Sequence, residues 1–102
     1  MRRLLFVCSG NYYRSRFAEA VFNFHAARLD EPVRAFSRGL AIHLVAGAGD
    51  LSPHTREALN VRGIPLRHTG PAPAALTRAD LEDADRTIAL KEAEHRPLMR
   101  EQ

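Results

Sequence analysis

Cysteine and tryptophan are nearly absent from this sequence: Cys8 is the single cysteine among 102 residues, and there is no tryptophan. One cysteine forms no internal disulfide and no cysteine-rich zinc site, so disulfide-stapled secreted scaffolds and zinc ribbons are excluded. The histidines are scattered and do not pair at the spacing of metal ligands. We therefore expect neither a metal nor any other cofactor.

The sequence also lacks a long hydrophobic run. The first apolar run, Leu4–Cys8, has five residues, which is too few for a membrane span or for the core of a signal peptide. This pattern predicts a cytoplasmic protein that makes no membrane contact.

Positive charge is present but is not concentrated in one run. Lysine and arginine number 15 against 12 acidic residues, which gives a formal net charge of +3. Within residues 1–38 there are seven arginines and three acidic residues. Because no dense basic run and no alternation of basic and aromatic residues accompanies this excess, nucleic-acid binding is not expected. A small anionic group is a more suitable partner for this chain than nucleic acid.

Length and composition favour one domain. Hydrophobic residues make up 45% of the chain and charged residues 26%, which is typical of globular domains of about 100–150 residues and not of disordered chains. No repeat or interdomain linker divides the sequence. Residues 1–102 are therefore expected to form a single domain.

Hydrophobic patterning predicts three strands and a helix between the first two. Residues 4–8 lack polar alternation, as in a central strand buried on both faces of a parallel sheet. Residues 14–29 lack glycine and proline, and an apolar stripe recurs at helical spacing, so we expect an amphipathic helix whose stripe packs on the sheet. The stripe consists of Phe17, Val21 and Phe24, and the other predicted strands are 33–37 and 86–90.

Further helices have recognisable start signals. A serine and a proline at 52–53 predict an N-cap and a first helical position, and Gly63 is expected to end that helix. Thr77, with Asp80 three residues later, predicts a short helix. Residues 39–50 are interpreted as a loop and 92–100 as a helical tail. The alternation of strands and helices predicts an α/β fold with a parallel sheet, whose ligand site lies at the carboxyl ends of the strands.

The chemistry is expected between the first strand and the first helix, where an arginine follows the cysteine by six positions. A loop at this place can turn successive backbone N–H groups toward one point, and the helix N-terminus adds partial positive charge. The arginine can offer its planar fork to two oxygens of a phosphate-like dianion. The predicted catalytic residues are Cys8 and Arg14. The predicted phosphate-binding residues are Ser9, Gly10, Asn11, Tyr12, Tyr13, Arg14 and Ser15.

The same surroundings favour an ionised, nucleophilic thiolate at Cys8. Ser15 is a candidate donor to the charged sulfur. Gly10 is expected to allow a backbone conformation closed to residues with a Cβ, and Asn11 tolerates left-handed angles while its amide braces the loop. The alternative is a buried strand-end thiol followed by an ordinary surface arginine.

Residues 7–15, Val-Cys-Ser-Gly-Asn-Tyr-Tyr-Arg-Ser, resemble the phosphate-binding loop of the low-molecular-weight protein tyrosine phosphatases, whose pattern is V-C-x-G-N-x-x-R-S. The likeness continues more weakly over 52–64 and 81–90. It implies a three-layer α/β/α fold of flavodoxin-like order and hydrolysis of a phosphorylated protein or small phosphomonoester. Cys8 would attack phosphorus, while Arg14 and the loop amides hold the equatorial oxygens. The same resemblance implies binding of phosphate, sulfate and vanadate-like anions.

The sequence departs from this family at its carboxyl end. Family members have a fourth strand, a last helix and an Asp-Pro pair whose aspartate is the general acid, and none of these is found by Gln102. The last aspartate, Asp85, is expected to cap or turn the chain. We therefore expect either a shortened phosphatase with impaired activity or a variant kept for binding. An uncovered flank at Ile88 and Leu90 favours a homodimer through the open sheet edge.

The sequence is also compatible with functions other than phosphatase activity. A catalytically weak phosphate- or phosphopeptide-binding module is the principal alternative. An arsenate reductase would need further cysteines, and a phosphocysteine carrier would not need Arg14. Residues 39–50 offer no aromatic side chain to hold a phenyl ring, which leaves Tyr12 as the candidate, and His54 is a candidate to orient Asn11.

Overall fold

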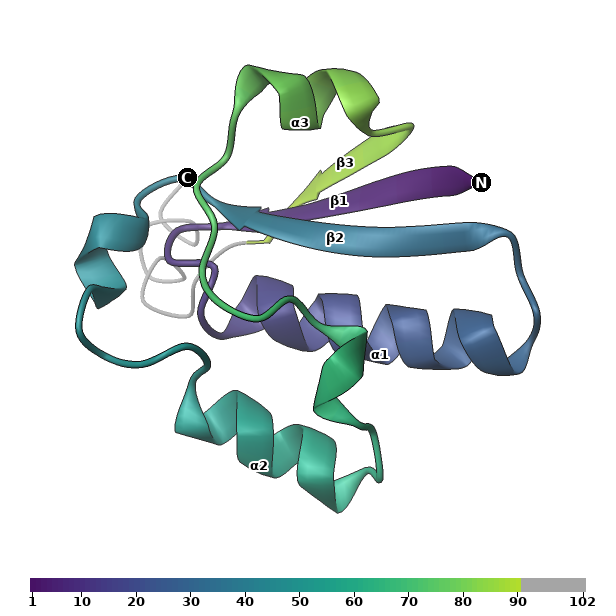
Figure 1. Cartoon of the computed structure of the whole chain (residues 1–102), viewed down its shortest axis with the longest axis horizontal. Coiled ribbons are helices and arrows are strands. Elements are labelled where there is room, and N and C mark those ends of the chain that lie inside the picture. Colours follow the sequence, from purple (N-terminus) through teal and green to yellow (C-terminus); the bar gives the residue numbers. More distant parts are fainter. Residues whose placement is uncertain (91–102) are drawn as a thin grey trace, which may run out of the picture.

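The computed structural model describes residues 1–90 as an α/β unit (Figure 1). The helical tail expected at 92–100 lies outside the described residues. The elements in chain order are β1 (Arg2–Cys8), α1 (Arg14–Arg28), β2 (Val33–Gly39), the 3-10 helix η1 (Ile42–Val45), α2 (Pro53–Val61), the 3-10 helix η2 (Leu66–His68), α3 (Arg78–Asp83) and β3 (Arg86–Ala89). The predicted strands and helices within 1–90 are confirmed, and the loop at 39–50 contains the additional η1.

The sheet is parallel and has the order β2-β1-β3, with Leu4 of β1 opposite Ala35 of β2 and Arg86 of β3. The central place of β1 explains why its run lacks polar alternation, since both faces are covered. Helix α1 lies on one face of the sheet and α3 on the other (Figure 1). The expected three-layer α/β/α architecture of flavodoxin-like order is therefore confirmed.

The face that α1 buries differs from the prediction. Its buried residues are Ser15, Arg16, Glu19, Ala20, Asn23 and Ala26. The apolar stripe of Phe17, Val21 and Phe24 is only partly buried, and it packs against a cluster formed by Ala20, Leu59 and Ile64. The stripe therefore joins α1 to α2, and the polar face turns toward the sheet because hydrogen bonds satisfy it. Asn23, for example, donates to the carbonyl of Ala35 at 3.0 Å and accepts from the amide of Ala35 at 2.7 Å.

The predicted helix caps are present. The Ser52 hydroxyl accepts from the amide of His54 at 3.2 Å, and Gly63 ends the following turn with a φ of 69°. Thr77 and Asp80 form a reciprocal capping box at the start of α3. Burial acts to raise the pKa of Asp80, but hydrogen bonds from Thr77 and Arg38 outweigh it and hold that pKa below its usual range. The stability that Asp80 contributes is therefore present above the usual aspartate range and is lost as the pH falls through the lowered value.

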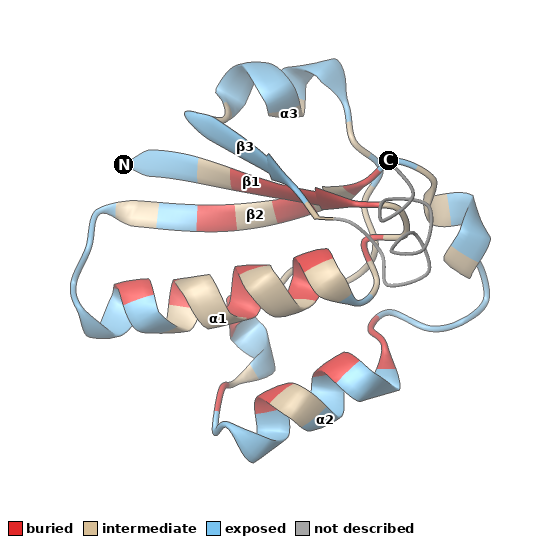
Figure 2. Cartoon of the chain, turned by 180° about the vertical axis from the view of Figure 1, so that it is seen from behind, coloured by how far each residue is buried: buried red, intermediate tan, exposed pale blue. Residues whose placement is uncertain are grey.

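Burial is concentrated near the carboxyl end of β1 (Figure 2). Leu5 has no exposed surface and Cys8 only 2%. By contrast, every residue of β3 is exposed, Ile88 by 36%. The best-packed part of the described chain is thus the end of the sheet where Cys8 leads into its loop.

Candidate active site

The backbone carbonyls of the Cys8 loop bond outward to surrounding segments. Leu40 and Ala41, just beyond β2, donate their amides to the carbonyls of Cys8 and Ser9 at 2.9 and 2.7 Å. The further outward bonds are Ser52 N to Tyr12 O at 3.1 Å, the Thr55 hydroxyl to Tyr13 O at 3.2 Å, and the Arg16 guanidinium to Asn11 O at 3.4 Å. Segments from three parts of the chain therefore fix the orientation of the loop peptides.

This orientation determines where the loop N–H groups lie. No cis peptide bond occurs within residues 1–90, and in a trans peptide the N–H points away from the C=O of the same unit. Since the carbonyls face outward, the N–H groups of the next residues face the interior of the loop. These are the amides of Ser9, Gly10, Tyr12, Tyr13 and Arg14. The loop is therefore a cup of inward-facing N–H groups in front of the N-terminus of α1, where the helix adds partial positive charge.

The sulfur of Cys8 lies at the base of this cup. Its Sγ atom is 2.9 Å from the Ser15 hydroxyl and accepts the amide of Asn11 at 3.2 Å. The structure thus brings Cys8 and Ser15 together as the sequence predicted.

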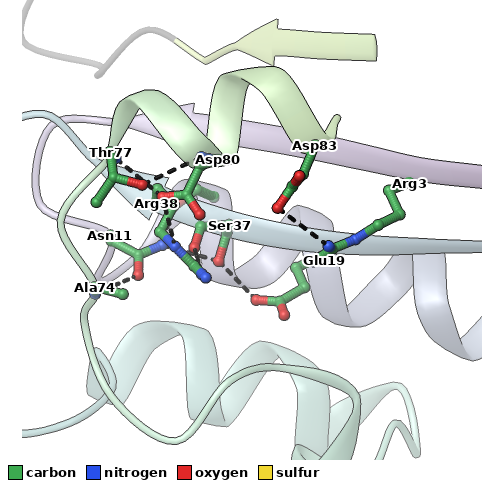
Figure 3. A network of polar contacts seen from close by, with 10 residues as sticks. Arg3, Asn11, Glu19, Ser37, Arg38, Ala74, Thr77, Asp80 and Asp83 are labelled. Carbon is green, nitrogen blue, oxygen red and sulfur yellow. Dashed lines mark hydrogen bonds and ion pairs between the residues drawn. The ribbon is translucent and has the colours of Figure 1, made fainter. Parts of the chain in front are cut away.

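Asn11 braces the loop through a left-handed backbone (φ 49°) and three side-chain hydrogen bonds. Its Nδ2 donates to the hydroxyls of Ser15 at 2.9 Å and Ser37 at 2.8 Å, and its Oδ1 accepts the amide of Ala74 at 2.8 Å (Figure 3). The suggestion that His54 orients Asn11 is wrong, because these groups occupy the amide. The ring of His54 lies instead beside that of Tyr13, with centroids 6.3 Å apart.

Two glycines of the site lie close to neighbouring segments. Gly10 does not have the positive φ that the sequence suggested, since Asn11 takes the left-handed position. A Cβ on Gly10 would lie 3.0 Å from the side chain of Val45 in η1. At the end of β2, a Cβ on Gly39 would lie 2.9 Å from the amide of Asn11. Both glycines let neighbouring segments close around the loop.

The two tyrosines of the loop have different surroundings. Tyr12, the expected aromatic wall, is half-buried and donates its hydroxyl to the carbonyl of Ala48 at 2.8 Å. Tyr13 is 44% exposed and its ring lies 5.9 Å from the guanidinium carbon of Arg14. A cleft beside the loop is lined by Tyr13, Arg14, Phe17, Ala58, Arg62, Ala89 and Leu90. Tyr13 and Phe17 are therefore the aromatic side chains that line the cleft beside Arg14.

Sequence reasoning missed the residues that support the loop from behind. Glu19 accepts the hydroxyl of Ser37 at 2.6 Å, and Ser37 in turn accepts from Asn11 (Figure 3). Ser15, Glu19 and Asn23 are four residues apart on one face of α1. That row of small and polar side chains was the available signal, because it predicts a polar helix face.

The described chain shows no arrangement typical of a metal site or of a membrane span. Within residues 1–90, no three His, Cys, Asp or Glu side chains are grouped so that they could hold a metal ion. No described helix is both long enough and apolar enough to cross a membrane.

Comparison with known proteins identifies relatives that are similar in sequence and in fold. A curated protein-arginine-phosphatase of Bacillus subtilis (strain 168) is 36% identical over 87 residues, which are 85% of this chain and 54% of the relative. A low molecular weight protein tyrosine phosphatase from T. tengcongensis is 30% identical, with a TM-score of 0.77 over 98% of this chain and 65% of that structure. The arginine phosphatase YwlE of Bacillus subtilis, solved with a phosphorylated active-site serine, is 31% identical, with a TM-score of 0.74 over 98% of this chain and 61% of its own.

The chain thus spans about half to two thirds of the length of these relatives. The family model of the low molecular weight phosphotyrosine protein phosphatases matches residues 3–102, which is nearly the whole sequence. The chain therefore belongs to the low molecular weight phosphotyrosine protein phosphatase family.

Proposed function

We propose that this chain is a phosphomonoester hydrolase that acts through a phosphocysteine intermediate on Cys8. The observation that carries the proposal is the outward bonding of the loop carbonyls, which turns the loop amides toward the buried sulfur. Such a cup binds the three peripheral oxygens of a phosphoryl group while the sulfur lies behind the phosphorus. Residues 1–102 act in this proposal as one phosphatase-like domain.

The reaction has two steps. In the first, the Cys8 thiolate attacks phosphorus, so an S–P bond forms and the bond from phosphorus to the ester oxygen breaks. In the second, water attacks the phosphocysteine, which releases phosphate and restores the thiolate. Arg14 and the loop amides stabilise the negative charge of the phosphoryl oxygens in both transition states.

The described carboxylates do not provide an evident acid for the leaving oxygen. Asp85 accepts the amide of Arg3 at 2.7 Å, at the start of β1 and thus at the other end of the strand from Cys8. Its predicted capping role is supported by this bond. We infer that the leaving group takes its proton from water. Hydrolysis by the 102-residue chain should therefore be slow for esters whose leaving alcohol is weakly acidic.

This inference predicts a strong dependence of rate on the leaving group. Because general acid catalysis contributes about 10²–10⁴-fold, turnover of an alkyl phosphate should be below that of p-nitrophenyl phosphate by at least that factor. The measurement is kcat/KM for a series of aryl and alkyl phosphates plotted against the acidity of the leaving alcohol. A flat plot would contradict the inference, because it would show that an acid protonates the leaving oxygen.

A phosphorylated side chain of a protein is the proposed substrate. The named relatives include both tyrosine and arginine phosphatases, and here the exposed ring of Tyr13 borders the cleft beside Arg14. A small phosphomonoester is the simplest alternative. A cysteine acts as a nucleophile only when it is not oxidised, so a reducing compartment such as the cytoplasm suits the proposed reaction.

A phosphate- or phosphopeptide-binding module is the second candidate, and the absence of an evident acid among the described residues favours it. An arsenate reductase or a phosphocysteine carrier fits less well. The first would pass oxidation to further cysteines, whereas Cys8 stands alone in the sequence. The second gives no role to Arg14. Binding of vanadate without any turnover of p-nitrophenyl phosphate would favour the binding module.

We also propose that a second copy pairs along the outer edge of β3. No strand within residues 1–90 pairs with that edge, and all four residues of β3 are exposed. An open edge presents unpaired N–H and C=O groups to another chain. Sedimentation velocity should show a concentration-dependent dimer that Thr87→Pro weakens, because proline lacks a donor. A monomer at all concentrations would contradict this proposal.

A further inference from the structure

Arg16 is a buried arginine that the proposed mechanism does not use. Only 1% of its surface is exposed, although it lies in the first turn of α1, directly after the Cys8 loop. Nε donates to the Thr69 hydroxyl at 2.7 Å, and Nη1 donates to the carbonyl of Asp50 at 2.7 Å. The guanidinium also donates to the carbonyls of Gly70 and, at 3.4 Å, of Asn11. A buried guanidinium with so many acceptors is held in one position.

These acceptors belong to the two segments that flank the Cys8 loop. Asp50 lies just after Ala48, whose carbonyl accepts from Tyr12, and shortly before Ser52, whose amide donates to the Tyr12 carbonyl. On the other side, Gly70 leads to Ala74, whose amide donates to Asn11. Arg16 therefore joins one segment that bonds the carbonyl of Tyr12 to another segment that bonds the side chain of Asn11.

Arg16 is also linked to the sulfur through a continuous series of hydrogen bonds. Thr69 accepts from Arg16 and donates to the carboxylate of Glu19 at 2.9 Å. The series continues from Glu19 to the Cys8 sulfur through Ser37, Asn11 and Ser15. Glu19 is 6% exposed, and a buried carboxylate needs a nearby positive charge. Arg16 supplies that charge.

We propose that Arg16 is a positioning residue for the phosphate site: by joining the segments at 50 and 69–70 behind the Cys8 loop, it fixes the loop amides that receive the oxyanion. This inference rests on the proposed function, which requires that cup. It adds to that function a second arginine that does not touch the substrate and acts through the loop.

The electrostatic surroundings of Arg16 agree with this role. Burial lowers the pKa of Arg16, while the negative charges of Glu19, Asp50 and Cys8 act in the opposite direction. The guanidinium is thus surrounded by acidic groups of the site, including the nucleophile itself.

The test compares vanadate affinity with thermal stability in four variants. Arg16→Gln removes the charge and the fork, Arg16→Lys keeps only the charge, and Arg16→Gln/Glu19→Gln removes the buried charge pair together. Arg56→Gln, on the exposed face of α2, is the matched control. Vanadate dissociation constants are measured by calorimetry and melting temperatures by circular dichroism on the full chain.

We expect Arg16→Gln and Arg16→Lys to weaken vanadate binding by about 10–100-fold, as small displacements of positioned groups do. The double variant should recover most of the melting temperature lost by Arg16→Gln but none of the affinity. Arg56→Gln should match the wild type in both. If Arg16→Gln fails to fold, Arg16→Lys and the double variant supply the comparison.

Two results would overturn the role of Arg16. One is wild-type vanadate affinity in a folded variant that lacks the arginine. The other is recovery of both affinity and stability in the double variant, which would mean that Arg16 only neutralises Glu19. If the wild type itself binds no vanadate, the proposed function fails. If the wild type binds vanadate and the Arg16 variants bind it equally well, the role of Arg16 is rejected and the proposed function is not.

Discussion

Replacing Cys8 with serine should abolish turnover of p-nitrophenyl phosphate while the anion site stays intact. A serine hydroxyl is not ionised at neutral pH, so the substitution removes the nucleophile with little change in volume. Loss of a nucleophile lowers kcat by about four to six orders of magnitude in comparable enzymes. The loop amides and Arg14 are unchanged, so vanadate or phosphate should still bind. Steady-state kinetics and calorimetry measure the two properties separately.

The melting temperature of Cys8→Ser is the control, because a destabilised loop would also lose activity. Cys8 is 2% exposed and its sulfur is 2.9 Å from the Ser15 hydroxyl, so serine can keep that hydrogen bond. Turnover that survives the substitution in a folded protein would show that another group attacks phosphorus.

Replacing Arg14 with alanine should weaken both oxyanion binding and turnover. The arginine follows the loop amides, is half-buried and lines the cleft beside Tyr13. A guanidinium can hold two oxygens of a dianion. Loss of one such charge-stabilising group lowers kcat by about 10²–10³-fold. Arg14→Lys should fall between wild type and alanine, because lysine keeps the charge without the planar fork. The measurements are vanadate affinity and kcat/KM for p-nitrophenyl phosphate.

Arg56→Ala, on the exposed face of α2, controls for the loss of one positive charge from the protein as a whole. It should leave vanadate affinity and turnover unchanged. Undiminished oxyanion binding in Arg14→Ala would mean that the loop does not bind anions in the proposed way.

Features that depend on local chemistry were predictable from the sequence. The buried run at 4–8, the serine–proline start at 52–53 and the Thr77–Asp80 capping box all appear in the structure. Each of these signals depends on neighbouring residues along the chain. The loop was predictable for the same reason, since Cys8 and Arg14 lie within one short segment.

Features that depend on tertiary contacts were not predictable. The spacing of Glu19 and Asn23 indicates a polar face on α1, but the direction in which that face turns was not predictable. It turns to the sheet because both side chains find partners on β2, which comes later in the chain. Gly10 does not have a positive φ, and the close approach of the Val45 side chain leaves little room for a Cβ at this position. Arg16 could not be distinguished from the other arginines, because its acceptors on Asp50, Thr69 and Gly70 lie more than thirty residues away in sequence.

The central claim is that the Cys8 loop binds oxyanions directly in front of a nucleophilic sulfur, and alkylation by iodoacetamide tests it most directly. The rate is measured at neutral pH, with and without phosphate or vanadate, with Arg14→Ala as the comparison. The account predicts alkylation of Cys8 in the free protein, strong protection by either oxyanion in the wild type, and loss of that protection in the variant. Alkylation that is unaffected by oxyanions would contradict it.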